Sequence, residues 1–157
     1  MPKVYILKLI DNKFYVGSSK NVENRFKQHL SGKGSRWTKK FTPLEIISII
    51  PNTDKFDEDK YVKKFMNSYG IQSTRGGSYS SIVLPDFQLL SLRMELSTIQ
   101  NRCFNCMEQG HFASECPEEK ISFVICGRCK KLGHSREDCF SCEDSNGKLI
   151  NDKCIMM

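Results

Sequence analysis

The chain has 157 residues, of which 27% are charged and 39% are hydrophobic, and its net charge is +6. That length suits one ordinary domain with a small appendage. No apolar run approaches the 18 or so residues of a membrane-spanning helix, so we expect no membrane partner. Because no signal peptide precedes the first strand, we expect an intracellular location, in the cytoplasm or nucleus.

The charge is divided unevenly along the chain. Residues 1–85 hold 15 Lys and Arg against 7 Asp and Glu, whereas residues 86–157 hold 9 against 11. A polyanion such as nucleic acid would therefore gain electrostatic affinity from the N-terminal part. Charged side chains usually just face solvent, so the excess of basic residues is evidence for a nucleic-acid partner only if the same part of the chain also holds candidate catalytic residues.

The residue pattern predicts an α+β fold for the N-terminal part. We expect strands over 3–10 and 14–18 joined by a turn at 11–13, a helix over 22–30, a third strand over 44–50 and a helix over 57–69. The Gly-Gly-Ser sequence at 76–78 breaks the pattern, and a short strand around 79–84 can follow it. We therefore predict a small three-stranded antiparallel sheet flanked by helices.

The turn of the first hairpin decides where two tyrosines point. With a two-residue loop, paired residue numbers sum to about 23, and Tyr5 and Tyr15 face opposite sides of the sheet. A three-residue loop places them on one face, and Asn12 tolerates the left-handed conformation that such a loop with a G1 bulge needs. We therefore predict a three-residue loop with a bulge. The alternative role of two strand tyrosines is core packing.

Polar groups lie beside the apolar stripes of both predicted helices. Arg25 and His29 are four residues apart, so they share one face of the helix over 22–30. Glu58 continues the apolar stripe of the helix over 57–69, where a carboxylate is costly unless it is paired or binds a metal. Glu58 can also simply complement the helix dipole in the first turn.

These residues resemble the GIY-YIG nuclease family. The first motif of the family appears as Val4-Tyr5-Ile6 and the second as Tyr15-Val16-Gly17, while its helix arginine, the histidine of many members and its metal-binding glutamate match Arg25, His29 and Glu58. The resemblance covers roughly residues 3–84, and the stretch over 70–79 resembles a Gly-Gly-containing end of members with zinc knuckles. The asparagine that many members carry late in the site has no counterpart between 68 and 100.

The resemblance implies hydrolysis of a phosphodiester in DNA with one divalent metal, Mg²⁺ or Mn²⁺. Glu58 would hold the metal. Tyr5 would orient or deprotonate the attacking water, and His29 would assist it because a phenol is a poor base at neutral pH. Arg25 would neutralise charge that builds on the phosphate, and Tyr15 would position it.

Four basic side chains surround Trp37, the only tryptophan of the chain. They are Lys33, Arg36, Lys39 and Lys40. We predict that they contact phosphates of the nucleic acid. Trp37 itself belongs either to this surface or to the core.

The spacing C-x2-C-x4-H-x4-C occurs twice near the C-terminus. The candidate ligands are Cys103, Cys106, His111 and Cys116 in the first copy, and Cys126, Cys129, His134 and Cys139 in the second. Three thiolates and one imidazole suit a closed tetrahedral zinc site, and so short a module needs the metal to fold. The spacing resembles the zinc knuckle, a module that binds single-stranded nucleic acid. We therefore expect two structural Zn²⁺ ions.

The cysteines allow two other arrangements, a cross-braced zinc module and disulfides. An intracellular chain keeps its thiols reduced, which favours metal over disulfides. Cys142 and Cys154 lie outside the repeat and can be a spare pair, a partial third site or free thiols.

The two knuckles differ where they would meet nucleic acid. The first has Phe104 and Phe112, which suit stacking on an unpaired base, although they can instead pack on each other or on the helix over 87–100. The second has small residues there, with three basic side chains nearby, Arg128, Lys130 and Lys131. We expect base contacts from the first knuckle and phosphate contacts from the second, to DNA or, as the alternative, to RNA.

The sequence thus predicts a metal-dependent DNA endonuclease with an accessory nucleic-acid-binding tail. Its parts are a nuclease-like domain over 1–85, a connecting helix over 86–101, knuckles over 102–117 and 125–140, and a tail over 141–157. The main alternative is a non-catalytic nucleic-acid-binding protein on a retired nuclease scaffold, and a protein-interaction subunit is a third. Convergence of the two tyrosines, the arginine, the histidine and the glutamate on one cleft discriminates between the first two.

Overall fold

A computed structural model describes residues 1–119, 126–131, 135–137, 139–144 and 146–150. The chain divides into two compact units, Met1–Leu84 and Pro85–Met157. Within the described residues, no helix combines the length and the apolar character needed to cross a membrane.

The first unit is built on a four-stranded mixed sheet in the order β3-β1-β2-β4. The strands are β1 (Lys3–Leu9), β2 (Lys13–Ser19), β3 (Pro43–Ile50) and β4 (Thr74–Gly76). β1 runs antiparallel to β2 and to β3, whereas β4 runs parallel to β2. The prediction of a three-stranded antiparallel sheet is therefore wrong, because β4 adds a fourth, parallel strand.

Arg75 explains why the expected strand around 79–84 does not form. Its guanidinium is almost fully buried and takes the carbonyls that a strand would need: Nε donates to Ser81 O at 2.7 Å and Nη2 to Ile82 O at 3.1 Å. It also lies 4.6 Å from the centre of the Trp37 ring. Burial lowers the pKa of Arg75 to about 10, so it remains charged at neutral pH. The segment after β4 is thus a loop wrapped around a cation.

The β1–β2 hairpin has a three-residue loop, as predicted, but the loop spans Ile10–Asn12 rather than the expected 11–13. Two of its residues, Asp11 and Asn12, take the left-handed conformation with φ of 55° and 52°. Asn and Asp tolerate this region better than other non-glycine residues. The pairing stays in constant register up to Leu9 opposite Lys13, so the predicted bulge is absent from it.

The helices are α1 (Val22–Leu30), α2 (Arg36–Lys40), α3 (Asp57–Tyr69) and α4 (Asp86–Ile99), with short 3-10 turns at Ile10–Asn12, Ile71–Ser73 and Ala113–Glu115. Asn21 caps α1, since its side chain accepts a hydrogen bond from Asn24 N at 2.9 Å. Gly70 ends α3 with a φ of 93°. The sequence did not predict α2, which is capped by Ser35.

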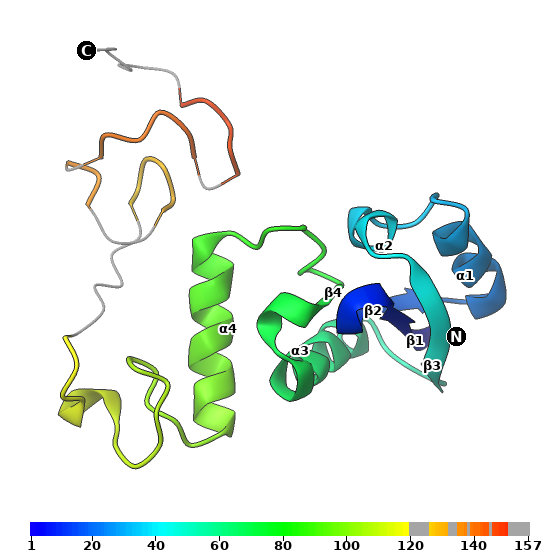
Figure 1. Cartoon of the computed structure of the whole chain (residues 1–157), viewed down its shortest axis with the longest axis horizontal. Coiled ribbons are helices and arrows are strands. Elements are labelled where there is room, and N and C mark those ends of the chain that lie inside the picture. Colours follow the sequence, from blue (N-terminus) through cyan, green and yellow to red (C-terminus); the bar gives the residue numbers. More distant parts are fainter. Residues whose placement is uncertain (120–125, 132–134, 138, 145, 151–157) are drawn as a thin grey trace. The chain divides into compact units, whose positions relative to one another are not determined.

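Apolar side chains cover both faces of the sheet. On one face, Tyr5, Leu7, Leu9 and Tyr15 form a buried cluster with Val22 of α1 and Trp37 of α2. On the other face, Phe14 packs on the rings of Phe65 and Tyr69 of α3, with centroid distances of 5.6 and 4.3 Å. In Figure 1, β1 and β2 accordingly lie between α3 on one side and α1 and α2 on the other. The two tyrosines of the sequence motifs therefore belong to the α1 face.

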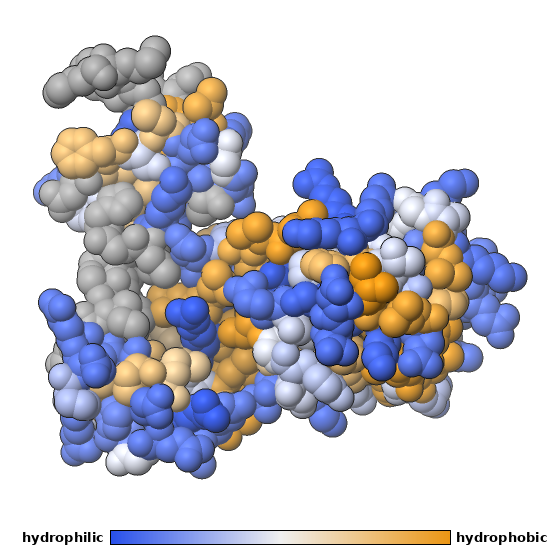
Figure 2. Space-filling model, viewed as in Figure 1, coloured by the Kyte–Doolittle hydropathy of each residue, from blue (hydrophilic) through white to orange (hydrophobic). Residues whose placement is uncertain are grey.

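β3 is an edge strand with apolar side chains in solvent. Leu44, Ile47 and Ile49 are 56%, 40% and 46% exposed. The pairing of β3 with β1 shifts register twice along its length, and such irregularities protect a sheet edge from pairing with another chain. On the visible face, apolar patches are interspersed among hydrophilic side chains (Figure 2).

Candidate active site

The hairpin register brings the two tyrosines together. Tyr5 lies opposite Gly17 and Tyr15 lies opposite Leu7, so both side chains project from one face. Their ring centroids are 6.4 Å apart. A Cβ at position 17 would lie 2.4 Å from the Tyr5 hydroxyl, so glycine there makes room for the phenol. The glycine of the second motif is therefore required by the tyrosine of the first.

His29, near the C-terminal end of α1, packs against both tyrosine rings. Its Nε2 is 2.9 Å from the Tyr5 hydroxyl, and its ring centroid is 4.9 Å from that of Tyr15. Burial, with a smaller contribution from the charge of Arg25, lowers the pKa of His29 to about 4. Because this pKa lies well below 7, the buried imidazole, which is only 1% exposed, is neutral at neutral pH. A neutral imidazole can accept a proton, which is what a general base requires.

Both phenols are protonated in the free protein. Burial raises the pKa of Tyr5, and the neighbouring Tyr15 raises it further. Burial also raises the pKa of Tyr15, with the Glu58 carboxylate adding to the effect. The guanidinium of Arg25 acts in the opposite direction on both. The charges of Arg25 on α1 and of Glu58 on α3 thus both act on this pair of tyrosines.

Glu58 lies in the first turn of α3 and is partly buried. Its Oε1 accepts a hydrogen bond from Gly77 N at 3.0 Å. Burial raises the pKa of the carboxyl group, while the bond from Gly77 and the charge of Arg25 lower it. The carboxylate is therefore held in place by backbone and is only partly desolvated.

The loop over 76–78 is a part of the site that sequence analysis missed. Ser78 donates to Asp59 from its backbone N at 2.8 Å and from its hydroxyl at 2.6 Å. Gly77 has a φ of +47°, and a Cβ there would lie 1.9 Å from Asp59 Oδ1. Only glycine lets this loop close on the start of α3 and present its N–H to Glu58. The Gly-Gly pair was the available signal, but the sequence did not say which carboxylates it would meet.

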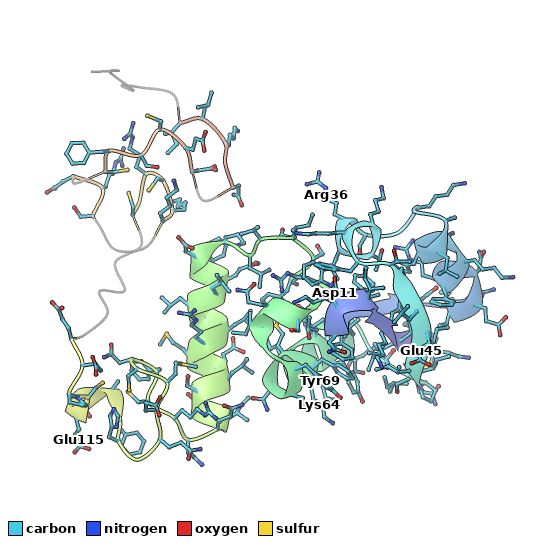
Figure 3. All side chains as sticks on the ribbon, in the orientation of Figure 1. Asp11, Arg36, Glu45, Lys64, Tyr69 and Glu115 are labelled. Atoms are coloured by element: carbon cyan, nitrogen blue, oxygen red, sulfur yellow. The ribbon has the colours of Figure 1, made fainter. Side chains whose placement is uncertain are left out.

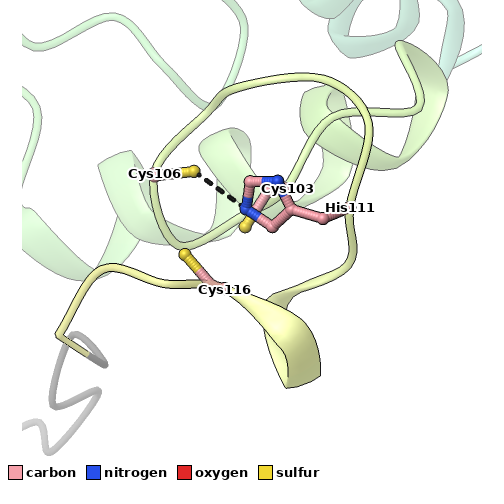
Figure 4. Close-up of side chains that lie close together, drawn as sticks. All are labelled: Cys103, Cys106, His111 and Cys116. Carbon is pink, nitrogen blue, oxygen red and sulfur yellow. Dashed lines mark hydrogen bonds between the residues drawn. The ribbon is translucent and has the colours of Figure 1, made fainter.

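The first knuckle gathers its four predicted ligands (Figure 4). The ligand atoms of Cys103, Cys106, His111 and Cys116 all lie within 4.8 Å of one another, with Cys106 Sγ 3.3 Å from His111 Nε2. Four ligand atoms at this spacing can bind one Zn²⁺ at the usual bond lengths, which are about 2.0 Å for a nitrogen ligand and about 2.3 Å for a sulfur ligand. The donor set, three sulfurs and one imidazole nitrogen, also fits zinc.

Asn105 ties this ligand cluster to the chain that follows it. Its Nδ2 donates to Cys116 Sγ at 3.2 Å and to the carbonyls of Glu118 and Glu119 at 3.4 and 3.2 Å. A bond to a ligating sulfur orients the ligand, as outer contacts do at many metal sites.

In the second knuckle, Cys126, Cys129 and Cys139 come within 4.8 Å of one another, and the fourth predicted ligand, His134, lies outside the described residues. Each cluster is formed within one repeat, so the described ligands are not cross-braced, and all six of these cysteines are free of disulfides. Outside the repeat, Cys142 is disulfide-bonded, so it is neither a free thiol nor a zinc ligand, and Cys154 lies outside the described residues.

The comparisons with known proteins agree with this geometry. Residues 1–70 match the GIY-YIG catalytic domain, and residues 101–118 match the zinc knuckle. A UPF0213 protein of Oceanobacillus iheyensis is 34% identical over 90 residues, which are 57% of this chain and 85% of that protein. The chain belongs to the GIY-YIG family. This family consists of endonucleases, and membership suggests a nuclease-type function and a nucleic-acid partner for the GIY-YIG domain.

Other relatives match shorter stretches. A UPF0213 protein of Natronomonas pharaonis is 37% identical over 54 residues, 34% of this chain and 59% of that protein. An uncharacterized protein of Schizosaccharomyces pombe is 39% identical over 54 residues, 34% of this chain and 23% of that protein. No solved structure matches the chain.

Glu58 of the GIY-YIG domain fits a hard divalent cation. A carboxylate offers two oxygens with about four lone-pair sites, and the bond from Gly77 uses one of them. Mg²⁺ typically takes one or two carboxylates and keeps several waters. A carboxylate with a pKa raised by burial also gains from a nearby positive charge. Glu58 is therefore suited to hold Mg²⁺ or Mn²⁺.

The four basic residues around Trp37 that are predicted to contact phosphates are all exposed: Lys33, Arg36, Lys39 and Lys40. Arg36 extends outward from α2 (Figure 3). Trp37, by contrast, is 3% exposed and donates from Nε1 to Phe14 O at 3.0 Å. Of the two roles open to Trp37, the core residue is correct. The phosphate contacts stay a prediction.

The knuckle residues predicted to bind nucleic acid differ in how they are held. Phe112 is 76% exposed and Phe104 is 37% exposed. Arg128 Nη1 donates to Cys139 O at 2.9 Å, so its guanidinium supports the second knuckle from inside. The basic groups of Lys130 and Lys131 donate to Gly127 O at 3.0 Å and to Ser141 Oγ at 2.9 Å. Contacts of these five residues with nucleic acid stay predictions.

The lowered pKa of His29 predicts how the free energy of unfolding of the GIY-YIG domain depends on pH. A histidine binds a proton at a pH of about 6.5 in the unfolded chain, but its pKa is about 4 in the fold, so the unfolded state binds more protons between these values. Stability is therefore full above about pH 6.5 and falls as the pH drops toward 4, by up to about 3 kcal/mol. His29→Gln should flatten this fall. Urea unfolding followed by fluorescence of the single tryptophan checks it, and equal slopes for both proteins would contradict it.

Proposed function

We propose that the protein is a divalent-metal-dependent DNA endonuclease that hydrolyses phosphodiester bonds, and that its zinc knuckles bind nucleic acid. One observation supports the proposal: Tyr5, Tyr15 and His29 pack together on the α1 face of the sheet, and the charges of Arg25 and Glu58 both act on the two tyrosines.

The residues divide the reaction between them. Glu58 would hold Mg²⁺, which acts as a Lewis acid toward the phosphate and lowers the pKa of bound water. Tyr15 positions the phosphate, and Arg25 neutralises charge that builds on it. Tyr5 takes a proton from the attacking water while its own phenolic proton passes to His29 Nε2, 2.9 Å away. The water oxygen bonds to phosphorus, the bond to the leaving sugar oxygen breaks, and that oxygen is protonated by solvent.

The proton transfer needs help from the bound substrate. In the free protein, the raised pKa of Tyr5 and the lowered pKa of His29 keep the proton on the phenol. An anionic phosphate beside His29 favours the imidazolium and so narrows this difference. The site is therefore expected to transfer the proton only when nucleic acid is bound.

A cleavage assay tests the proposal. The purified protein is incubated with nicked, branched and linear DNA, once with Mg²⁺ or Mn²⁺ and once with excess EDTA. Metal-dependent cleavage of at least one substrate is expected. If the protein binds these DNAs but cuts none of them with either metal, the non-catalytic alternative is correct.

The first knuckle is expected to bind unpaired bases through its two phenylalanines. Stacking of one base on an aromatic ring contributes about 1–3 kcal/mol, so Phe104→Ala with Phe112→Ala should weaken binding of a single strand by at least about tenfold. Zinc content should stay unchanged, because neither ring is a ligand. Fluorescence anisotropy with single-stranded DNA and RNA measures the effect and also ranks the two nucleic acids.

Phe87→Ala is the matched control, since Phe87 is 41% exposed on α4, outside both knuckles. It should leave binding unchanged. Equal affinity of the double variant and the unmodified protein would mean that the first knuckle does not use these rings.

A further inference from the structure

Thr38 contacts the ring nitrogen of His29 that faces away from Tyr5. Its Oγ1 lies 2.8 Å from His29 Nδ1, and the Thr38 side chain is 2% exposed. Both imidazole nitrogens are thus in hydrogen bonds inside the protein, Nε2 with Tyr5 and Nδ1 with Thr38. A neutral imidazole carries one proton, so one nitrogen donates and the other accepts.

The partners of the Thr38 hydroxyl decide which nitrogen carries the proton. Thr38 Oγ1 lies 3.0 Å from the backbone carbonyl oxygen of Ser35. Thr38 Oγ1 also lies 3.2 Å from Ser35 Oγ, a hydroxyl that can donate as well as accept. The carbonyl oxygen can only accept, so we assign the single hydroxyl proton of Thr38 to Ser35 O and a lone pair of Oγ1 to the Ser35 hydroxyl. The other lone pair of Thr38 Oγ1 then faces His29 Nδ1, which must donate. The remaining nitrogen, Nε2, is left as an acceptor toward Tyr5.

We infer that Thr38 is a positioning residue for His29: it fixes the Nδ1–H tautomer, so that the basic nitrogen faces Tyr5. The opposite tautomer would place an N–H against the phenol and leave Tyr5 without a proton acceptor. The consequence for cleavage rests on the proposed function, whereas the tautomer is a property of the free protein. This arrangement also keeps both N–H groups hydrogen-bonded once His29 becomes an imidazolium.

The chain around Thr38 is built to hold this contact. A Cβ at Gly34 would lie 2.1 Å from His29 Nδ1 and 2.7 Å from Thr38 Oγ1, so glycine leaves the gap in which the two atoms meet. Ser35 caps α2, because its Oγ accepts from Thr38 N at 3.2 Å. A five-residue helix has little stability by itself, so the Ser35 cap and the contact of Thr38 with His29 help to stabilise α2 in this position.

The tautomer can be read directly by NMR. In a long-range ¹H–¹⁵N spectrum of the full-length protein with labelled histidine, the protonated and unprotonated ring nitrogens resonate in separate regions. The chain has three histidines, and His29→Ala identifies the signals of residue 29. Nδ1–H is expected at neutral pH. Thr38→Val keeps the shape of the side chain but removes the acceptor, so it should shift His29 toward the Nε2–H form, and Thr38→Ser should restore Nδ1–H.

The same variants should change cleavage in a specific way. Thr38→Val should lower kcat by at least about tenfold, as part of the roughly 100-fold or more that a general base contributes, with KM for DNA within about threefold. Thr38→Ser should recover most of the rate. Fluorescence of Trp37 reports whether each variant is folded.

The outcomes separate this inference from the proposed function. An Nε2–H tautomer in the unmodified protein overturns it, as does a folded Thr38→Val variant that keeps Nδ1–H. If Thr38→Val does not fold, the spectra of the unmodified protein and of Thr38→Ser decide. If the protein cuts no DNA, the proposed function fails, while the NMR result still confirms or overturns the role of Thr38.

Discussion

Glu58→Gln is expected to lower the DNA cleavage rate by at least about 1,000-fold, which corresponds to about 4 kcal/mol of transition-state stabilisation. Glutamine removes the charge that would hold the divalent metal. It keeps the size of the side chain and an oxygen that can accept from Gly77 N, as Glu58 Oε1 does at 3.0 Å. The loop over 76–78 should therefore stay on the start of α3.

Stability should move little, and if anything upward. Burial raises the pKa of Glu58, which means that the fold disfavours its charged form. Removing that charge relieves the unfavourable desolvation while the hydrogen bond remains. A thermal unfolding midpoint at or slightly above that of the unmodified protein, together with the lost rate, would separate a chemical role from a structural one.

Single-turnover cleavage with excess protein measures the effect without interference from product release. Glu23→Gln is the matched control, because Glu23 is an exposed carboxylate in the first turn of another helix, α1. Its rate should stay within about twofold, since a single exposed charge acts weakly through solvent. Cleavage by Glu58→Gln at the rate of the unmodified protein would remove Glu58 from the mechanism.

The parts of the site that follow from local sequence could be predicted. The loop at Asp11 and Asn12 depends on residues that tolerate left-handed backbone, and its length alone sets the facing of Tyr5 and Tyr15. Arg25 and His29 share a face because they are four residues apart on one helix. Each of these inferences needed only a few neighbouring residues.

Long-range pairing could not be predicted in the same way. β4 has three residues and pairs parallel to β2, from Phe14 opposite Thr74 to Val16 opposite Gly76. So short a segment carries no periodicity, and its strand character comes from β2 and α3 rather than from its own residues. The role of Thr38 could not be predicted for the same reason. The helix that carries it, α2, is too short to recognise from sequence, and the role of Thr38 depends on its contact with His29, which is distant in the chain.

The knuckles contain one feature that local sequence could predict and one that it could not. The Cys and His spacing determined the ligand cluster of the first knuckle, since a closed metal site is a local structure. The sequence also suggested Arg128 as a phosphate contact on charge alone. The sequence did not show that its guanidinium also donates to Cys139 O, a contact that depends on how the second knuckle folds.

Removing zinc is expected to unfold the first knuckle while the GIY-YIG domain stays folded. The described part of the knuckle, residues 101–118, has few buried side chains, and the most buried of them, Cys103, is itself a ligand. Small zinc modules gain about 10–16 kcal/mol from the metal at neutral pH, more than their packing supplies. The first unit has its own cluster of buried side chains around Tyr5 and Trp37.

A zinc-selective chelator, with released zinc measured by a colorimetric dye, makes the test quantitative. NMR amide signals of residues 101–118 should move to the random-coil region. The fluorescence of Trp37, and the midpoint of urea unfolding of the GIY-YIG domain that it reports, should not change. Cys106→Ser should reproduce the loss without chelator, because it removes one of the four ligands. With Mg²⁺ restored, DNA cleavage should persist at saturating DNA, and affinity for single strands should fall. Loss of the Trp37 signal on chelation would mean that zinc also stabilises the GIY-YIG domain.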